Sequence, residues 1–378
     1  MKNGPELAKI VEAGLNKDSS KVLNYTLFLI EKLEKDGDFD FANRLKSIVQ
    51  RTKKIELKTM NSSLSILKPP VDQESRLPLA EIYTPSENDI FLCMNIWSKE
   101  MIEDFIGLIN KSDELSDKID VYRSILLYGP PGTGKSQSAK YISTKTKLPL
   151  VTIRIDGLVS SYLGSTSKNI RALFEFVKQT PCILFLDEFD AIAKMRDDSH
   201  ELGELKRVVN TLLQNIDGIK GIVPIIAATN HDHLLDPAVW RRFDFKIKFD
   251  LPNKEERFLL FRHFLKNVTI SEKTLKLLKE ISDKMNGAEI ENFCEYILTN
   301  SLLKKIDYFD EKRTFDLFVK YRTEGKNFVD DEGFKKEKIL MIKKMRQQNS
   351  KFFNYELSSK ILGCSKSTIF EKLKKEEG

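Results

Sequence analysis

The feature that most constrains this chain is the segment 129–136, which fits the pattern G-x-x-x-x-G-K-[ST]. An apolar run at 125–128 precedes it and a helix-compatible run at 137–142 follows, which is the strand–loop–helix context that the pattern requires. Glycines allow the tight turn in which successive N–H groups face a phosphate, and the N-terminus of the next helix adds a positive dipole end. The sequence therefore predicts a phosphate-binding loop made of Gly129, Pro130, Pro131, Gly132, Thr133, Gly134, Lys135 and Ser136. In such a loop the lysine meets the β- and γ-phosphates and the hydroxyl ligates Mg²⁺, so ATP and Mg²⁺ are the expected ligands.

Two acidic residues, Asp187 and Glu188, follow a second apolar run at 183–186. Because the carboxyl ends of parallel strands meet at one edge of a sheet, both carboxylates are expected beside the phosphate-binding loop. Asp187 fits the Mg²⁺ shell, and Glu188 fits the group that polarises an attacking water. The pair favours hydrolysis over a switch or a kinase, and capping of a following helix is the alternative role for such acids.

Short apolar runs alternate with helical stretches from about residue 91 to residue 250. This alternation predicts an α/β fold, with a parallel sheet that helices cover on both faces. The expected strands are 124–128, 150–154, 182–186, 222–228 and 246–250.

The length of 378 residues exceeds what one compact core holds, so two or three domains are expected. Helical periodicity near the N-terminus predicts a small all-α bundle, which serves either for docking or as a structural cap. Serine and proline interruptions then mark a linker. The expected divisions are a helical bundle at 1–55, a linker at 56–90, a phosphate-binding α/β part at 91–251, a helical part at 252–332 and a basic tail at 333–378.

Composition sets limits on the class of protein. Hydrophobic residues make up 41% and charged residues 31%, which excludes a fully disordered chain. No apolar run approaches the roughly 18 residues of a membrane helix, so no membrane partner is expected. The four cysteines are far apart and form neither a zinc spacing nor a dense disulfide framework. These features predict a reduced, cytoplasmic protein.

Further motifs follow Asp187 and Glu188 along the chain. Together, the phosphate-binding loop, the acid pair and these later motifs resemble those of the AAA family of ATPases. The similar branch contains katanin, spastin and the AAA proteases, and the resemblance covers about residues 120–300. The segment 227–230, Ala-Ala-Thr-Asn, resembles the sensor 1 motif, so Asn230 would hold the lytic water. The resemblance implies ATP hydrolysis and the fold of an AAA+ P-loop nucleoside triphosphatase. That fold is a parallel five-stranded sheet between helices followed by a helical lid, here with small all-α segments at both ends.

The segment 235–244 resembles the arginine-finger segment of this branch, with Arg241 and Arg242 as the fingers. A guanidinium can meet the charge that shifts onto the γ-phosphoryl oxygens with paired hydrogen bonds. In the family the fingers reach the nucleotide of the neighbouring subunit, so the resemblance implies a homo-oligomer, most simply a hexameric ring. For either arginine alone, a surface ion pair is the alternative role.

The segment 285–292 resembles the part of the small domain where a Gly-Ala pair packs near the nucleotide. Gly287 and Ala288 would then contact the bound nucleotide, and the N-terminus of a helix is an equal alternative. No sensor 2 arginine occupies this segment, which matches the branch.

Tyr162, Leu163 and Gly164 resemble the pore loop of the family, an aromatic–aliphatic–glycine tongue that grips an extended polypeptide. An aromatic ring suits this role because it packs on any side chain that passes. Ser165 departs from the glutamate that the family commonly places there. A buried aromatic is the alternative role for Tyr162, and 194–204 falls where a second pore loop or a solvated loop would lie.

The tail from 333 to 378 carries 12 Lys and Arg against 5 Asp and Glu, so its balance is +7 within a total of +6. Two short helical runs on either side of Gly363 are similar to a helix-turn-helix module, in which Phe370 would pack in the core. Its exposed face suits phosphate contacts with DNA, without arginine for base readout. A hairpin that braces the ring or docks a protein is the alternative. The possible contacts are Lys366, Ser367, Thr368, Lys372, Lys374 and Lys375.

Three functions fit these features. The first is an ATP-driven ring that remodels or unfolds a protein through its pore, with delivery to a separate protease as one outcome. The second is an ATP-dependent DNA-binding factor that uses the tail, as a loader or a switch. The third is a nucleotide-gated assembly scaffold with little turnover.

Overall fold

A computed structural model describes most of the chain from residue 69 onward and part of the N-terminal segment. The described residues are 26, 29–30, 32–33, 38–39, 41–46, 69–72, 75–85, 90–112, 123–154, 163–191, 204–305, 308–323 and 331–374. The chain divides into two compact units, residues 1–68 and 69–378.

In the first unit the described residues Leu29, Ile30, Leu33 and Ala42 form a small buried cluster with Leu45 packed against it. Most of the bundle expected at 1–55 lies outside the described residues.

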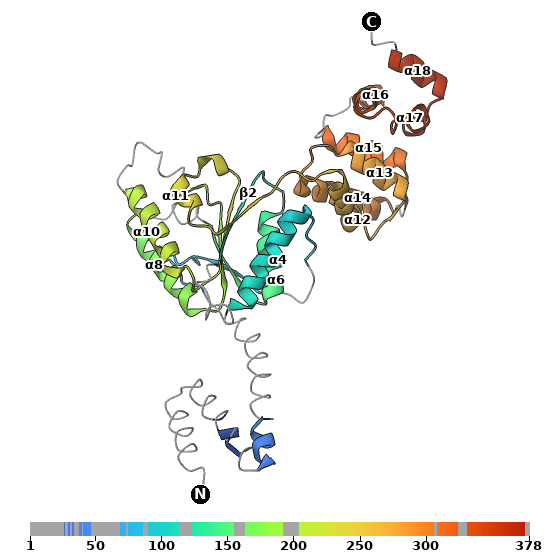
Figure 1. Ribbon diagram of the computed structural model, residues 1–378. Coiled ribbons are helices and arrows are strands. Elements are labelled where there is room, and N and C mark those ends of the chain that lie inside the picture. The colour runs from blue at the N-terminus through green and yellow to red at the C-terminus, as the bar shows by residue number, and fades with distance from the viewer. Residues whose placement is uncertain are drawn as a thin grey trace. The chain divides into compact units, whose positions relative to one another are not determined.

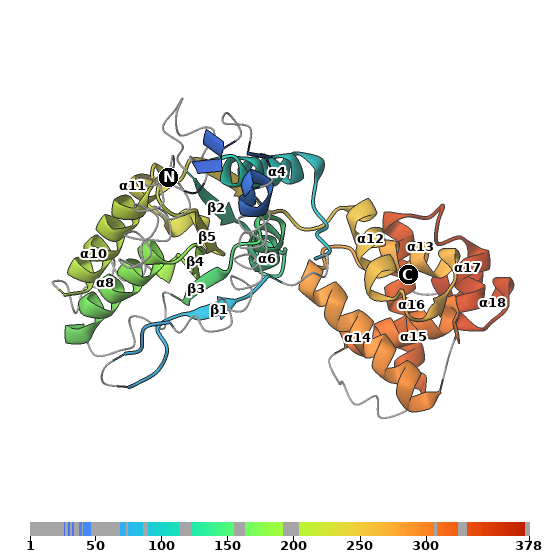
Figure 2. The same ribbon diagram turned by 90° about the horizontal axis from the view of Figure 1, so that it is seen from below.

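The second unit is built on a six-stranded sheet with the order β1-β3-β4-β5-β2-β6. Five strands are parallel, as the sequence predicts: β2 (Ser124–Tyr128), β3 (Leu150–Arg154), β4 (Ile183–Asp187), β5 (Ile225–Thr229) and β6 (Phe245–Lys248). The sixth strand, β1 (Glu81–Tyr83), pairs antiparallel with β3 at the edge, which Figure 2 shows. It forms inside the stretch that was expected to be linker, because an unpaired edge strand offers free N–H and C=O groups that a short extended segment can satisfy.

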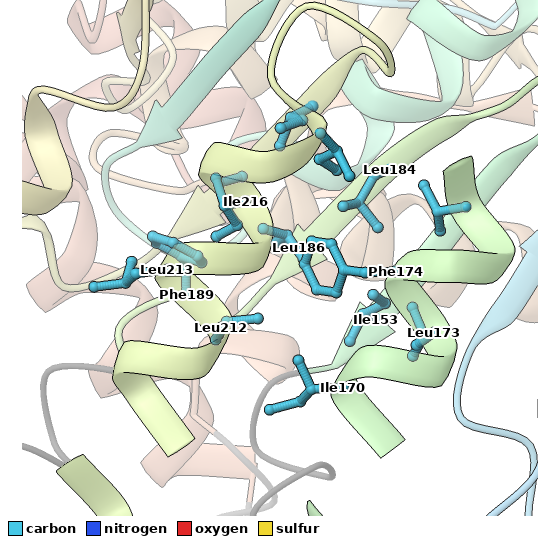
Figure 3. Close-up of a cluster of buried hydrophobic side chains, with 14 of the residues drawn as sticks. Ile153, Ile170, Leu173, Phe174, Leu184, Leu186, Phe189, Leu212, Leu213 and Ile216 are labelled. Carbon is cyan, nitrogen blue, oxygen red and sulfur yellow. The ribbon is translucent and has the colours of Figure 1, made fainter. Parts of the chain in front are cut away.

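Helices cover both faces of the sheet (Figure 1). On one face α8 (Leu163–Gln179) and α10 (Glu204–Ile219) pack in a cluster that contains Phe174, Leu186 and Ile216. Figure 3 shows these side chains meeting between the two helices and the strands. On the other face α4 (Ile96–Asn110) and α6 (Lys135–Thr146) pack in a second cluster. Because apolar layers bury both faces, the strands are continuous hydrophobic runs rather than alternating ones.

The lid is a helical part with its own hydrophobic core. Its elements are α12 (Lys254–Phe264), β7 (Thr269–Ile270), α13 (Glu272–Ile281), α14 (Gly287–Lys304), β8 (Tyr308–Phe309) and α15 (Glu311–Arg322). Phe293 lies at the centre, edge-on to Phe261 and Phe318, an arrangement that aromatic rings prefer. The two short strands pair in parallel.

The C-terminal helices α16 (Asp331–Gln348), α17 (Tyr355–Leu362) and α18 (Lys366–Lys374) share the core of the lid. Ile342, Phe353 and Ile361 are buried in the same cluster as the lid phenylalanines. The segment that was expected to be a separate tail is therefore part of the lid body. Within the described residues, no helix is long and apolar enough to cross a bilayer.

The turn between α17 and α18 has the geometry that the sequence predicts. Gly363 ends α17 with φ +66°, a left-handed conformation that favours glycine. Ser365 caps α18 by accepting the Thr368 N–H at 3.2 Å. The prediction for Phe370 was wrong: its neighbour Ile369 is buried, whereas Phe370 is 46% exposed because the next helical position points about 100° away.

Candidate functional site

The predicted phosphate-binding loop joins the end of β2 to the start of α6 and has the conformation that its glycines require. Gly129, Gly132 and Gly134 all have positive φ, of 136°, 70° and 101°. A Cβ on Gly129 would lie 2.0 Å from the carbonyl oxygen of Phe249, the residue that follows β6, so no other residue fits there. The chain thus folds the loop tightly against β6 and turns its backbone toward the space above the sheet.

Lys135 is the first residue of α6 and only 7% exposed. Its Nζ donates to the Gly129 oxygen at 2.9 Å and to the Pro130 oxygen at 2.7 Å. Burial lowers the pKa of Lys135 to about 8, while Asp187 and Asp190 oppose that shift. The amine therefore keeps its proton at neutral pH and supplies a positive charge inside the loop.

Ser136 and Asp187 lie side by side across the carboxyl edge of the sheet. The Ser136 hydroxyl donates to the Asp187 Oδ2 at 3.2 Å, which joins the loop to the end of β4. A hydroxyl and a carboxylate are hard oxygen ligands of the kind that Mg²⁺ prefers. The two residues therefore fit the metal shell that the sequence assigns to them.

Glu188 follows directly and has φ +54°, which is uncommon for a residue other than glycine. Its N–H donates to the Asp187 Oδ1 at 2.9 Å. The turn lets both acids of the pair line the same cavity although they are consecutive in sequence. The helix-capping alternative does not describe this position, because Glu188 lies in a left-handed turn.

Asn230 stands at the end of β5, the strand next to β4, and lines the same cavity. Its Oδ1 is buried and has no hydrogen-bond partner within the described part of the chain. A buried polar atom without a partner is costly, so this oxygen marks a place for a ligand or a water.

Sequence reasoning missed Asp190, a buried acid close to Lys135. Asp190 is 4% exposed, and its Oδ1 accepts from the Thr229 hydroxyl at 3.1 Å. Thr229 Oγ1 in turn accepts the His231 N–H at 3.0 Å, which fixes the backbone on both sides of Asn230. The signal in the sequence was a third acid two residues after Glu188.

The lid reaches the loop through the start of α14. Asn286 caps this helix in a capping box with Glu289, and the Ala288 N–H donates to the Gly132 oxygen at 3.1 Å. A Cβ on Gly287 would lie 3.0 Å from that same oxygen. Gly287 and Ala288 are thus both the N-terminus of a helix and neighbours of the phosphate-binding loop.

These groups surround a cavity of about 760 Å³. The segment 90–95 forms one wall, where Phe91 stacks on His263 of α12 with 3.8 Å between ring centroids. Burial lowers the pKa of His263, which favours the neutral ring. The sequence does not predict this wall, since nothing in the pattern links Phe91 and His263, which are about 170 positions apart. Aromatic rings that line the same cavity as a phosphate loop can hold a planar base while the loop holds its phosphates.

The two arginines of the predicted finger segment differ in their surroundings. Both follow the short helix α11 (Pro237–Trp240), whose Trp240 packs edge-on against Tyr128 at the end of β2. Arg242 is held by Asp217 of α10 through Nε and Nη2, at 3.0–3.2 Å. Arg241 is exposed and forms no ion pair with any described residue. Neither arginine is among the described residues that line the cavity.

The other predicted residues lie away from this cavity. Leu163 and Gly164 begin α8, while Tyr162 and the stretch 194–203 lie outside the described residues. In the C-terminal helices, Lys366, Ser367 and Thr368 form the first turn of α18, and Lys372 and Lys374 belong to the same helix. Lys375 lies outside the described residues.

A parallel sheet with a glycine-rich loop, a buried lysine and a serine–aspartate pair at its carboxyl edge defines a P-loop nucleotide-binding protein. Residues 125–251 match the family model "ATPase family associated with various cellular activities (AAA)". The AAA family ATPase y4kL of Sinorhizobium fredii is 38% identical over 233 residues, which are 60% of this chain and 68% of that protein. The chain therefore belongs to the AAA family of ATPases, enzymes that hydrolyse ATP.

Two further comparisons agree with this assignment. The proteasome-activating nucleotidase of Methanococcus vannielii is 33% identical over 241 residues, 61% of this chain and 59% of that protein. The crystal structure of the FIGL-1 AAA domain in complex with ADP superposes with a TM-score of 0.53 at 21% identity, covering 68% of this chain and 90% of that one. This structural likeness confirms the AAA+ fold.

Proposed function

We propose that this ATPase works as a ring, most simply a hexamer, in which each nucleotide site is completed by an arginine of the next subunit. The observation that carries the proposal is the position of Arg241. It is exposed at the end of α11 and has no ion-pair partner among the described residues, while the described wall of the cavity contains no arginine. A transferring phosphoryl group needs such a charge, and a second copy can supply it.

Within one site the proposed roles follow the geometry. Lys135 and the loop backbone hold the ATP phosphates, and Ser136 and Asp187 hold Mg²⁺, which screens the phosphate charge when bound. Glu188 orients and deprotonates the attacking water. Asn230 holds that water through its amide oxygen, which has no hydrogen-bond partner among the described residues. Gly287 and Ala288 connect the phosphate loop to the lid.

The proposed substrate is a protein that the ring pulls through its central pore. The segment Tyr162–Gly164 resembles a pore loop, and its last two residues begin α8. Relatives include proteins named proteasome-activating nucleotidases. Delivery to a separate protease is one form of this work. The four free cysteines fit the reducing cytoplasm, where we place the protein.

Mixing two inactive variants tests catalysis between subunits. Arg241→Ala keeps its own pocket but withholds its arginine, and Glu188→Gln keeps the arginine but disables its own pocket. If the two variants are mixed in equal amounts and assemble at random, roughly a quarter of the nucleotide sites combine an intact pocket with an intact Arg241 from the next subunit. We expect mixed rings to regain ATPase activity, measured by phosphate release.

The control mixes Glu188→Gln with Lys135→Ala, a pair in which no pocket is intact, so no recovery is expected. Co-assembly is checked by light scattering and by pull-down of a tagged subunit. If the first pair stays inactive at every ratio although the rings are mixed, the proposal of catalysis in trans is wrong.

A further inference from the structure

We propose that the lid and the first turn of α18 form one surface that binds the phosphates of duplex DNA. This surface goes beyond the ATPase proposed above. It has two adjoining parts, a basic hollow on the lid and the turn between α17 and α18.

The basic hollow has a volume of about 480 Å³ and lies beside α14, β8 and α15. Four cations line it, and the described residues form no ion pair with any of them: Lys304, Lys312, Arg313 and Lys320. Two carboxylates, Asp310 and Asp316, lie in the same wall. Asp316 pairs with Lys338, and Asp310 caps α15 by accepting the Arg313 N–H at 2.8 Å.

Lys312 joins the hollow to the turn. A Cβ on Gly363 would lie 3.0 Å from the Lys312 Nζ, so this amine lies directly beside the turn glycine. The next cation along the chain is Lys366, which is 65% exposed and has only a distant contact of 3.9 Å with Glu356. Positive charge therefore continues from the lid onto α18, where Lys366 is only weakly paired.

The shape of the C-terminal helices favours a duplex over a small anion. The left-handed Gly363 and the cap at Ser365 place α18 after α17 as in a helix-turn-helix, where the second helix lies in the major groove and nearby elements contact the backbone. Figures 1 and 2 both show α18 on the outer side of the C-terminal helices. Ser367 and Thr368 add hydroxyl groups at its first turn, which suit phosphate contacts.

The surface is built for DNA in general rather than for one sequence. Helix α18 contains lysine but no arginine, asparagine or glutamine, the side chains that make bidentate contacts with bases. Lysine contacts with phosphate depend on counterion release, so binding should weaken steeply with salt.

The test uses the full chain with a non-hydrolysable ATP analogue and a labelled 24-base-pair duplex of mixed sequence, read by fluorescence anisotropy over a salt series. The double variant Lys304→Gln, Lys312→Gln should lower the slope of log affinity against log salt by about 1.8, and the affinity by roughly tenfold at moderate salt. Lys366→Gln should lower the slope by about 0.9.

The matched control is Lys273→Gln, Lys276→Gln on α13, which removes two lid lysines outside the hollow and should leave binding unchanged. Three results would overturn the proposal. The wild type could show no salt-dependent binding of the duplex, or the control pair could lose as much affinity for the duplex as the Lys304→Gln, Lys312→Gln variant. Polyglutamate could also displace the labelled duplex as well as unlabelled duplex does, which would indicate an acidic protein partner. The lysine variants should keep their basal ATPase activity. If the wild type does not hydrolyse ATP, the proposed ring motor is contradicted. The anisotropy measurement still tests the DNA proposal, because it does not need ATP hydrolysis.

Discussion

Glu188, the proposed catalytic base, has an unusual backbone conformation. A left-handed conformation in a residue other than glycine costs roughly 1–3 kcal/mol and persists where the surroundings enforce it. Here the Asp187 carboxylate holds the Glu188 N–H, and buried Phe189 follows directly. The strain allows the proposed metal ligand Asp187 and the proposed base Glu188 to be neighbours in sequence and still line one cavity.

Replacement of Glu188 by glutamine should therefore separate binding from hydrolysis. The amide keeps the size and the turn but cannot accept a proton, so hydrolysis should fall roughly 10²–10⁴-fold. The affinity for ATP should stay close to wild type in a titration with a fluorescent ATP analogue. Turnover near the wild-type rate would remove Glu188 from the mechanism.

At the scale of elements, α11 has only four residues, so its position depends on contacts with neighbouring elements. Trp240 packs on Tyr128, and Arg242 is bound to Asp217 on α10 and to the Ala238 oxygen at 2.8 Å. We infer that Arg242 acts in the single chain as a brace that presents Arg241 to the next subunit.

Asp217→Asn tests this brace. Loss of an exposed ion pair is worth up to about 1 kcal/mol, so ATPase activity should fall at most about fivefold. Because the two residues act as one unit, Arg242→Ala combined with Asp217→Asn should cost no more than Arg242→Ala alone. The control is Glu272→Gln, which breaks an exposed ion pair with Lys276 on α13. Additive losses in the double variant would show that Arg242 acts independently of Asp217.

The elements also show what the sequence could and could not predict. The phosphate-binding loop and the five parallel strands were predictable because local geometry and long apolar runs determine them. Strand β1 was not, since its three residues gain their conformation only from β3, about 70 positions away. The stack of Phe91 on His263 and the ion pair of Arg242 with Asp217 likewise join residues that are far apart in the sequence, so local patterns do not predict them.

For the whole molecule, the predicted pore defines the substrate test. Tyr162→Ala should keep basal ATPase activity. It should lose the stimulation of ATPase activity by an unfolded protein such as casein, because the aromatic side chain proposed to grip the substrate polypeptide is removed. Tyr162→Phe keeps the aromatic ring and should behave as wild type. Stimulation of equal size in Tyr162→Ala would argue against grip by this loop.

Helix α14 touches the phosphate loop at its first turn, and its lid core continues into α16, α17 and α18. A body packed in this way turns as one piece, because dense side chains transmit displacement rather than absorb it. Any shift of Ala288 relative to Gly132 between nucleotide states would therefore also displace the C-terminal helices. In the proposed ring motor, a ligand held by these helices would therefore move with the lid in each ATP cycle.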